Sequence, residues 1–304
     1  MFFYTIYGLN ICSDYELDEA IARDAFDNID VNISAFEGED KLYDMTDEEI
    51  SRGAFQYRYA SDWCGVRFPT DGAFVIRDGN SISYKLYDGY ERLYVNEIIL
   101  CLALPIIMIQ RQMPMLHGSG LVFNDKCFVV SGVSGAGKST VTNALINEGA
   151  KFLADDTVAL GFHDGDAFAY PAYPQQKLCP DQVTEKIKQE STLIELPLEK
   201  GMSKYGVRDI NKFYADKKKL DALIVLNPTD KVTEPILEEI TGAEGFELFK
   251  NNIYQLAIYK RVGFSPDLLK KCLMIISKIK IYKLSRPLEG MTTDRQIAII
   301  KERL

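Results

Sequence analysis

With 304 residues and a net charge of −9, the chain is long enough for one large domain or two, and its charge argues against nucleic acid as the main partner. The six cysteines are widely spaced and no secretory signal is recognisable, which indicates reduced thiols in a cytoplasmic protein. The longest apolar run, residues 98–109, is too short for a membrane span and is broken by Pro105. We therefore expect no membrane partner and a buried helix over residues 92–112.

The charge is unevenly distributed. Residues 14–49 hold 14 acidic side chains against two basic ones, and residues 250–304 hold 12 basic against four acidic. The simplest interpretation is two solvated faces that attract each other within one chain or between two copies, which leaves a homo-oligomer open. The alternative is a basic C-terminal region that docks an acidic partner.

Residues 1–90 are predicted to be β-rich, because short β-prone runs alternate with turn residues. Asp78-Gly79-Asn80 is typical of a hairpin turn into a strand over residues 81–86. The acidic stretch over residues 37–49 is expected to form a loop and a short helix. The other predicted strands cover residues 31–36, 54–59, 65–68 and 73–77.

A second hairpin is predicted at Asn124-Asp125, which joins strands over residues 118–123 and 126–131. In that register His117 lies opposite Gly132, beside the motif described next. The alternative is a histidine that merely packs at a strand end. The second histidine, His163, is expected in a solvated polar turn.

From Gly132 to Ser139 the sequence reads G-x-x-x-x-G-K-S, the pattern of a phosphate-binding loop, with a strand-like run before it and a helical run after it. Glycines let backbone N–H groups turn toward phosphate oxygens, and the helix adds its positive end. We predict nucleoside-triphosphate binding, with Lys138 at the β- and γ-phosphates and the Ser139 hydroxyl on Mg²⁺. The expected nucleotide contacts are Gly132, Ser134, Gly135, Ala136, Gly137, Lys138, Ser139 and Thr140.

Asp155-Asp156 ends the next predicted strand, over residues 151–154. A compact strand–loop–helix–strand unit predicts two neighbouring parallel strands whose C-terminal ends lie together. The two aspartates are therefore expected to point at the metal and the γ-phosphate. The alternative is a polar turn. Further helices are predicted over residues 181–190, 242–260, 265–279 and 292–303, and strands over 168–173, 220–226 and 281–284.

His117, the phosphate loop and the aspartate pair together resemble the HPr kinase/phosphorylase family, and more closely its shorter relatives, which include kinases of free serine and of peptide precursors. The resemblance implies an α/β (α+β) fold: a P-loop kinase domain of the phosphoenolpyruvate carboxykinase type over residues 91–304, with the β-rich region over residues 1–90. The chain lacks the E-I-R-G-L-G stretch of true HPr kinases, which speaks against HPr as the acceptor and against the phosphorylase reaction. The matching stretches are 116–119, 132–140 and 153–156, with weaker likeness over 170–174 with 177–178, over 281–284, and over 7–9 with 13–14.

The leading hypothesis is a Mg²⁺–ATP-dependent kinase acting on a serine-like hydroxyl of a small molecule, peptide or protein. The resemblance implies that Ser139 and Asp156 hold the metal and that Asp155 is the base, with His117 orienting it or sharing its proton. The roles of the two aspartates are open to reversal. Three downstream cations are either partners of the γ-phosphate or ordinary surface residues: Lys177, Lys204 and Arg208.

Two other hypotheses remain. Asn227-Pro228-Thr229-Asp230 is similar to the guanine-reading N-K-x-D of a GTPase, but proline replaces the lysine and no D-x-x-G follows the aspartate strand. The other is a non-catalytic, regulatory nucleotide-binding module. The intact lysine, serine and aspartates of the predicted site speak against that reading.

Overall fold

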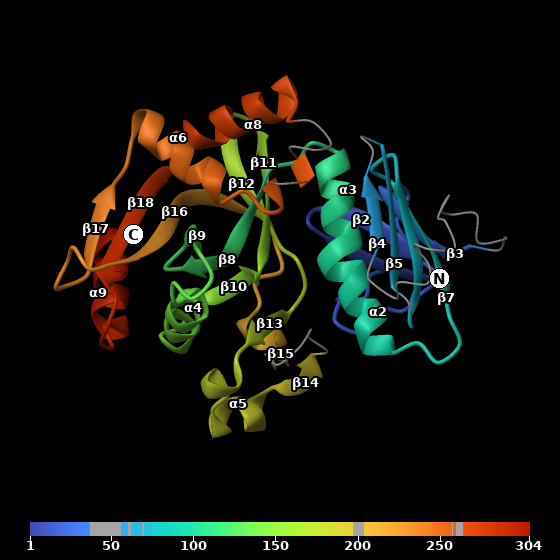
Figure 1. The fold of residues 1–304 in the computed structure, drawn as a ribbon, viewed down its shortest axis with the longest axis horizontal. Coiled ribbons are helices and arrows are strands. Elements are labelled where there is room, and N and C mark those ends of the chain that lie inside the picture. The colour runs from blue at the N-terminus through green and yellow to red at the C-terminus, as the bar shows by residue number, and fades with distance from the viewer. Residues whose placement is uncertain (37–55, 60–61, 69, 197–203, 257, 260–263) are drawn as a thin grey trace. The chain divides into compact units, whose positions relative to one another are not determined.

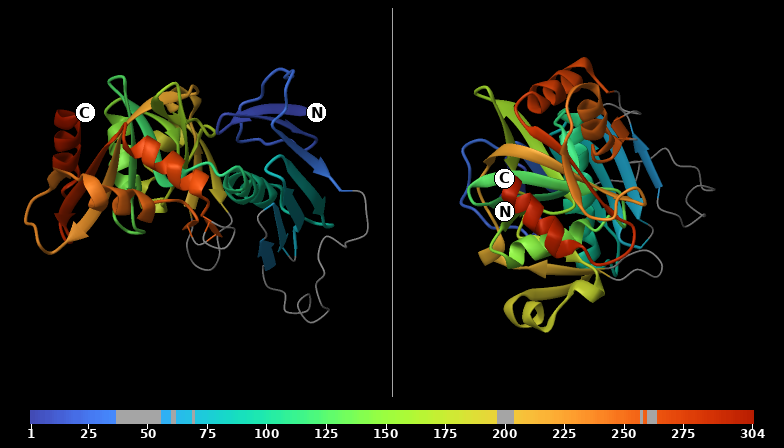
Figure 2. Two further views of the ribbon diagram at one scale, coloured as in Figure 1. Left: turned by 90° about the horizontal axis from the view of Figure 1, so that it is seen from above. Right: turned by 90° about the vertical axis from the view of Figure 1, so that its left-hand side faces the viewer.

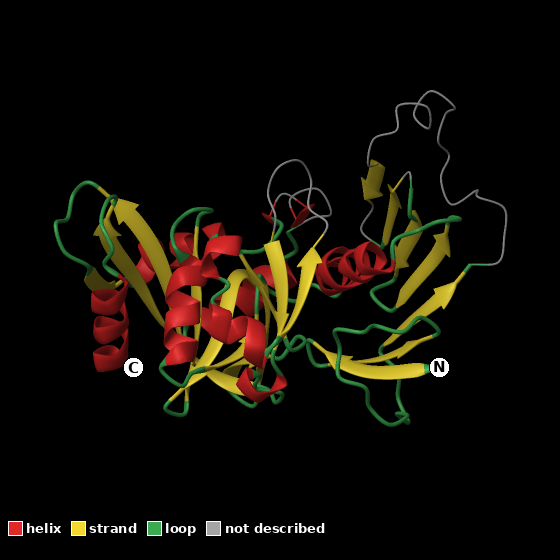
Figure 3. Ribbon diagram, turned by 90° about the horizontal axis from the view of Figure 1, so that it is seen from below, coloured by secondary structure: helices red, strands yellow, loops and turns green. Residues whose placement is uncertain are grey.

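The computed structural model describes residues 1–36, 56–59, 62–68, 70–196, 204–256, 258–259 and 264–304. The acidic stretch over residues 37–49, expected to be a loop and a short helix, lies outside them. The chain is a mixed α/β protein rich in strands (Figure 3). It forms two compact units, Met1–Met113 with Ala257–Ser265 and Pro114–Leu256 with Pro266–Leu304 (Figures 1 and 2). The sequence predicted a boundary near residue 90; in the structure the apolar helix belongs with the first unit.

The first unit contains a seven-stranded sheet in the order β1-β2-β3-β7-β6-β5-β4. The hairpin turn predicted at residues 78–80 is confirmed, because Arg77 pairs with Ser81 and both Asp78 and Gly79 have positive φ. The first two strands were not predicted. The strands are β1 (Phe2–Ile6), β2 (Leu9–Ser13), β3 (Val31–Ala35), β4 (Gln56–Tyr59), β5 (Trp63–Phe68), β6 (Gly72–Arg77) and β7 (Ser81–Leu86).

The apolar helix runs through α2 (Arg92–Ile98), a π-helical turn (Ile99–Ala103) and α3 (Leu104–Gln110). The helix continues through Pro105, as predicted, and a π-helical turn lies directly before the proline. By length and composition the helix over Arg92–Gln110, with a mean hydropathy of 1.9, is the one helix among the described residues that could cross a membrane; the apolar run over residues 98–109 is only part of it. The protein itself buries 67 % of its apolar window, which agrees with the predicted buried helix.

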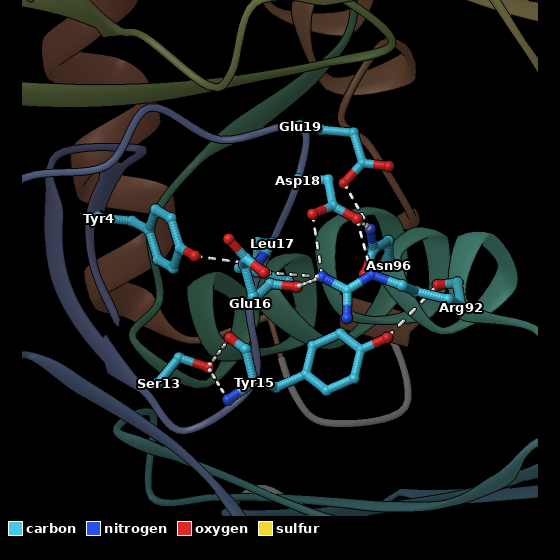
Figure 4. A network of polar contacts seen from close by, with 9 residues as sticks. All are labelled: Tyr4, Ser13, Tyr15, Glu16, Leu17, Asp18, Glu19, Arg92 and Asn96. Carbon is cyan, nitrogen blue, oxygen red and sulfur yellow. Dashed lines mark hydrogen bonds and ion pairs between the residues drawn. The ribbon is translucent and has the colours of Figure 1, made fainter. Parts of the chain in front are cut away.

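A polar network fixes the start of this helix to residues 15–19 (Figure 4). Arg92 makes a bidentate pair with Asp18, with Nε and Nη2 at 2.8 and 2.9 Å from the two carboxylate oxygens. One turn later Asn96 donates to Glu19 Oε2 at 2.8 Å, and burial raises the pKa of Glu19. Part of the acidic run over residues 14–49 therefore holds its own unit together rather than forming a solvated face.

The second unit is built on a curved sheet in the order β10-β8-β11-β12-β16-β18-β17, with β9 inserted between β8 and β16. The centre is parallel, since β16 pairs in parallel with both β9 and β18, and the flanks are antiparallel. The predicted hairpin register is confirmed, with Phe123 opposite Lys126 and Gly118 opposite Ser131. The strands are β8 (Met115–Phe123), β9 (Lys126–Gly132), β10 (Lys151–Ala154), β11 (Thr157–His163), β12 (Asp166–Tyr170), β16 (Lys218–Thr229), β17 (Ile236–Glu239) and β18 (Lys280–Pro287).

One topological prediction is wrong. The strands before the phosphate loop and before the aspartates, β9 and β10, are not neighbours, because β8 lies between them and pairs antiparallel with both. The hairpin turn returns β8 along one edge of β9, so β10 can add only at the far edge of β8. The two strands still run in the same direction, and their C-terminal ends face the same edge of the sheet.

Helices cover this sheet. α4 packs on β8 and β9 and against α9, and α8 packs on β11 and β12 and against α6 (Figure 1). The helix predicted over residues 242–260 ends at Asn251, because the chain turns there and Ile253 pairs with Leu116 at the start of β8. The helices are α4 (Lys138–Asn147), α6 (Gly242–Asn251), α8 (Pro266–Ile276) and α9 (Thr293–Arg303).

A three-stranded sheet in the order β13-β15-β14 completes the unit. The helix predicted over residues 181–190 is shorter, with a 3₁₀ turn (Pro180–Gln182) followed by α5 (Glu185–Glu190), which Thr184 caps through its side chain. The strands are β13 (Gln175–Leu178), β14 (Thr192–Leu196) and β15 (Lys204–Arg208).

Candidate active site

The phosphate loop follows a strand that is buried from Cys127 to Gly132. Gly132 ends β9 with φ of 145°, and a Cβ there would lie 2.9 Å from the carbonyl oxygen of Leu226 on β16. Gly137, directly before α4, has φ of 98°. Both conformations are strained for any residue with a side chain, so the two glycines of the motif are required by the backbone. The loop is held as a tight turn by a bond from Ala136 N to Val133 O of 3.1 Å.

The side chain of Lys138 folds back onto the start of this loop. Its Nζ donates to the carbonyl oxygens of Gly132, at 2.7 Å, and Val133, at 3.3 Å. Burial lowers the pKa of Lys138, and the charges of Asp156 and Asp155 act in the opposite direction. The ammonium group thus lies in a partly dry position where a phosphate would be its natural partner.

The two aspartates form a short interruption between β10 and β11. Ala154 pairs with Gly120 and Thr157 with His117, so the aspartates lie opposite Ser119 and Gly118 of the same strand, β8. Gly118 N donates to Asp156 O at 3.1 Å. The strand that pairs with the phosphate-loop strand therefore also fixes the aspartates.

Asp155 is held by two donors. Its Oδ1 accepts from the Ser119 hydroxyl at 2.6 Å, and its Oδ2 accepts from the main-chain N–H of Lys177 at 2.8 Å. Burial raises the pKa of Asp155, the charge of Asp156 adds to that rise, and the two hydrogen bonds oppose it. A carboxyl group with a raised pKa at such a place is typical of an acid–base group.

Asp156, not Asp155, lies beside the histidine. His117 Nδ1 is 3.1 Å from the main-chain oxygen of Asp156 and 3.5 Å from its Oδ1. The prediction that Asp155 points toward His117 is therefore wrong. The reason is local: Asp156 has φ of 67°, a left-handed conformation that turns its side chain out of the strand alternation and leaves it 37 % exposed. Strain of this kind accumulates at functional sites.

A partly buried network holds the main chain of His117 near the start of β8. Its N–H donates to Asn252 O at 2.8 Å. The Ser131 hydroxyl lies within hydrogen-bond distance of the main-chain oxygen of His117 and, at 2.7 Å, of Asn252 Oδ1. Ser119, Ser131 and Asn252 were not predicted from the sequence. The first two could have been found from the alternation of β8 and β9, but nothing local marks Asn252, which is distant in sequence.

Only some of the other predicted residues contact the candidate site. Of the three downstream cations, Lys204 lies close enough to Lys138 for its charge to lower the pKa of that lysine. Lys177 reaches the site through its main-chain N–H. Arg208 lies at the opposite end of β15 from Lys204. Of the loop residues, Thr140 accepts a bond from Gln182 Nε2 at 3.2 Å, and Ser134, Gly135 and Ala136 form the turn before α4, with Ser134 and Gly135 exposed.

Arg286, also missed, reaches the phosphate loop from β18. Its Nε donates to Ala136 O at 3.2 Å. A usable signal was present, because Arg286 follows the predicted strand over residues 281–284 by two positions. Asn227, the first residue of the GTPase-like stretch, donates to Ser285 Oγ at 3.2 Å within the sheet. The second histidine, His163, stacks on Phe168 with 4.2 Å between ring centroids, so the expected solvated role is wrong for its ring.

No group of three or more His, Cys, Asp or Glu side chains that could hold a metal occurs in the part of the chain that the structure describes. A magnesium ion brought by a nucleotide needs no such cage, since it takes one or two carboxylates together with phosphates and waters. The half-exposed carboxylate of Asp156 and the hydroxyl of Ser139, at the second position of α4, fit that requirement.

Comparison with known proteins adds little. No family model matches the sequence, and no curated protein matches it. Among solved structures, the Hpr(Ser) kinase/phosphatase from Coxiella burnetii is similar over 62 % of this chain and 95 % of its own, with 15 % identity and a TM-score of 0.33. A likeness this weak carries no inference about function, which therefore depends on the residues of the site.

Proposed function

We propose that this chain is a Mg²⁺–ATP-dependent kinase that transfers the γ-phosphoryl group to a serine-like hydroxyl of free serine, a peptide or a small protein. One observation carries the proposal: the strand β8 pairs with the strand that leads into the phosphate loop, and its residues Ser119 and Gly118 also hold Asp155 and Asp156. Phosphate-binding groups, a metal-binding acid and a base in one place are the parts that phosphoryl transfer requires.

The phosphate loop would hold the donor nucleotide. Its N–H groups and the N-terminus of α4 favour anionic oxygens, and Lys138 exchanges its bonds to Gly132 O and Val133 O for the β- and γ-phosphates. Ser139 and Asp156 would hold Mg²⁺, which would neutralise part of the phosphate charge. His117, at 3.5 Å from Asp156 Oδ1, orients that carboxylate.

Asp155 is the proposed base. Its carboxylate takes the proton of the acceptor hydroxyl while the hydroxyl oxygen bonds to the γ-phosphorus and the bond to the β–γ bridging oxygen breaks, which releases ADP. The raised pKa of Asp155 brings it nearer to the working pH, where a base is most effective. The bonds from Ser119 and Lys177 fix its orientation.

The test is transfer of the terminal phosphoryl group from γ-labelled ATP, with GTP as the alternative donor, to free serine, serine-containing peptides and HPr. Labelled product with one of these acceptors, absent for Lys138→Met, supports the kinase. Nucleotide binding without transfer to any acceptor, and without hydrolysis, supports the regulatory module instead. Preference for GTP over ATP would favour the GTPase.

A further inference from the structure

Arg286 lies at the same edge of the sheet as the phosphate loop. β18 is parallel to β16, and β16 is parallel to β9, so the three strands end together. Arg286 is the second-last residue of β18 and pairs with Pro228, two residues beyond the level at which Leu226 pairs with Gly132. A side chain of this length can therefore reach across β16 to the loop.

The guanidinium group of Arg286 is oriented by main-chain acceptors. Nε donates to Ala136 O at 3.2 Å, and Nη1 donates to Pro287 O at 2.8 Å. Nη2 lies on the Gly137 side, 3.7 Å from where a Cβ of that glycine would be. Arg286 makes no ion pair with a carboxylate of the described residues, so its positive charge is not neutralised by one of them.

The contact with Ala136 determines a peptide orientation. The Ala136 carbonyl and the Gly137 N–H belong to one planar trans peptide, in which the C=O and N–H bonds point in opposite directions. A donor that holds the carbonyl toward β18 therefore turns the N–H of Gly137 away from β18. Gly137 is the N-cap of α4 in a left-handed conformation, so without a partner this peptide could flip at low cost.

We propose that Arg286 is a positioning residue that fixes the Ala136–Gly137 peptide so that the Gly137 N–H points into the phosphate site. The inference rests on the proposed nucleotide binding and assigns a residue to it that is remote in sequence from the loop. Arg286 acts through the loop backbone, not through the nucleobase and not by direct charge on the phosphates.

Binding of MgATP and of inorganic tripolyphosphate, measured by calorimetry at constant ionic strength, separates these roles. Arg286→Met removes the donor and the charge. Arg286→Gln keeps an N–H donor at the same number of bonds from the backbone without the charge. Arg295→Met, at an exposed arginine of α9, is the control for the change in net charge, and Lys138→Met is the reference for loss of the phosphate site.

We expect Arg286→Met to weaken both ligands about tenfold, the loss for one hydrogen bond to a charged site, with Arg286→Gln recovering most of it and Arg295→Met unchanged. In ¹⁵N-glycine-labelled protein, the shift of the Gly137 amide on adding tripolyphosphate should shrink in Arg286→Met and return in Arg286→Gln. Melting temperatures of all variants identify any that fail to fold, and the amide shift of the folded Gln variant then decides the matter.

Several outcomes overturn the proposal. Equal binding by Arg286→Met and wild type would exclude a role for Arg286. Equal losses in the Met and Gln variants would show that charge, not the hydrogen bond, matters, and a loss for MgATP alone would indicate a nucleobase contact. If wild type bound neither ligand, the proposed function itself would fail, whereas loss only in Lys138→Met would leave that function intact and remove Arg286 from it.

Discussion

Removal of the Ser119 hydroxyl should lower the free energy of unfolding by an amount that depends on pH. Ser119 is 3 % exposed and donates to Asp155 Oδ1 at 2.6 Å, so Ser119→Ala removes a hydrogen bond to a buried carboxylate. Such bonds contribute about 2 kcal/mol to the free energy of unfolding when the acceptor is charged. Because the hydroxyl favours the ionised form, its loss should raise the pKa of Asp155 further above its ordinary value.

The direction in which the free energy of unfolding changes with pH follows from proton linkage. The pKa of Asp155 is raised on folding, so its ionisation lowers stability as the pH rises from that of an unfolded aspartate, about 3.9, through the folded value. Ser119→Ala widens that interval. The pH-dependent part of the variant's loss should therefore be complete above the variant's own folded pKa, and it should disappear below the folded pKa of the wild type, where the folded carboxyl group is protonated in both proteins.

Urea unfolding followed by far-UV circular dichroism across this range measures the effect. Ser131→Ala is the matched control, because its buried hydroxyl contacts carbonyl oxygens of His117 and Asn252 and no carboxylate. Its cost should be about 1 kcal/mol and independent of pH. In the kinase assay, the acidic limb of kcat/KM should move to higher pH in Ser119→Ala. A loss that is as flat with pH as that of the control would refute the reasoning.

Three further predictions concern the same site. Lys138→Met should abolish phosphoryl transfer and weaken nucleotide binding by about a hundredfold while the melting temperature is kept, and normal turnover in that variant would disprove the kinase. Asp156→Asn should weaken the Mg²⁺ dependence of nucleotide binding. Asp155→Asn should keep that dependence but lose phosphoryl transfer. The opposite pattern in titrations at varied Mg²⁺ would mean that the roles of the two aspartates are exchanged. Gly118→Ala should cost about 1–3 kcal/mol in chemical unfolding, because its Cβ would overlap the carbonyl oxygen of Val130, whereas Gly120→Ala, with only ordinary contacts, should cost less, and equal costs would contradict the packing described.

Local signals predicted much of the second unit. The phosphate loop stood between the expected strand and helix, and Asn124-Asp125 set the register of β8 against β9, because a two-residue turn with positive φ leaves one pairing. These features depend on neighbours in sequence or on a single hairpin.

The failures depend on distant contacts. Nothing in residues 151–154 indicates that β10 adds to β8 rather than to β9, because the edge was already occupied by a different part of the chain. The left-handed conformation of Asp156 could not be read from the alternation of a strand, and it reversed which aspartate meets His117. The early end of α6 follows from pairing of Ile253 with Leu116, a contact across the fold.

The position of β8 between β9 and β10 has a consequence for how the site can vary. His117 and Ser119 lie two residues apart on this strand, so both project to one face, and each meets a different aspartate. Deleting a single residue between Gly120 and Phe123 would slide the N-terminal half of β8 by one position against the hairpin and exchange its two faces. The histidine and serine would then leave the aspartates while the loop kept its sequence. Insertions elsewhere in the sheet can be accommodated at strand ends, but the proposed site requires that the number of residues in β8 stay the same.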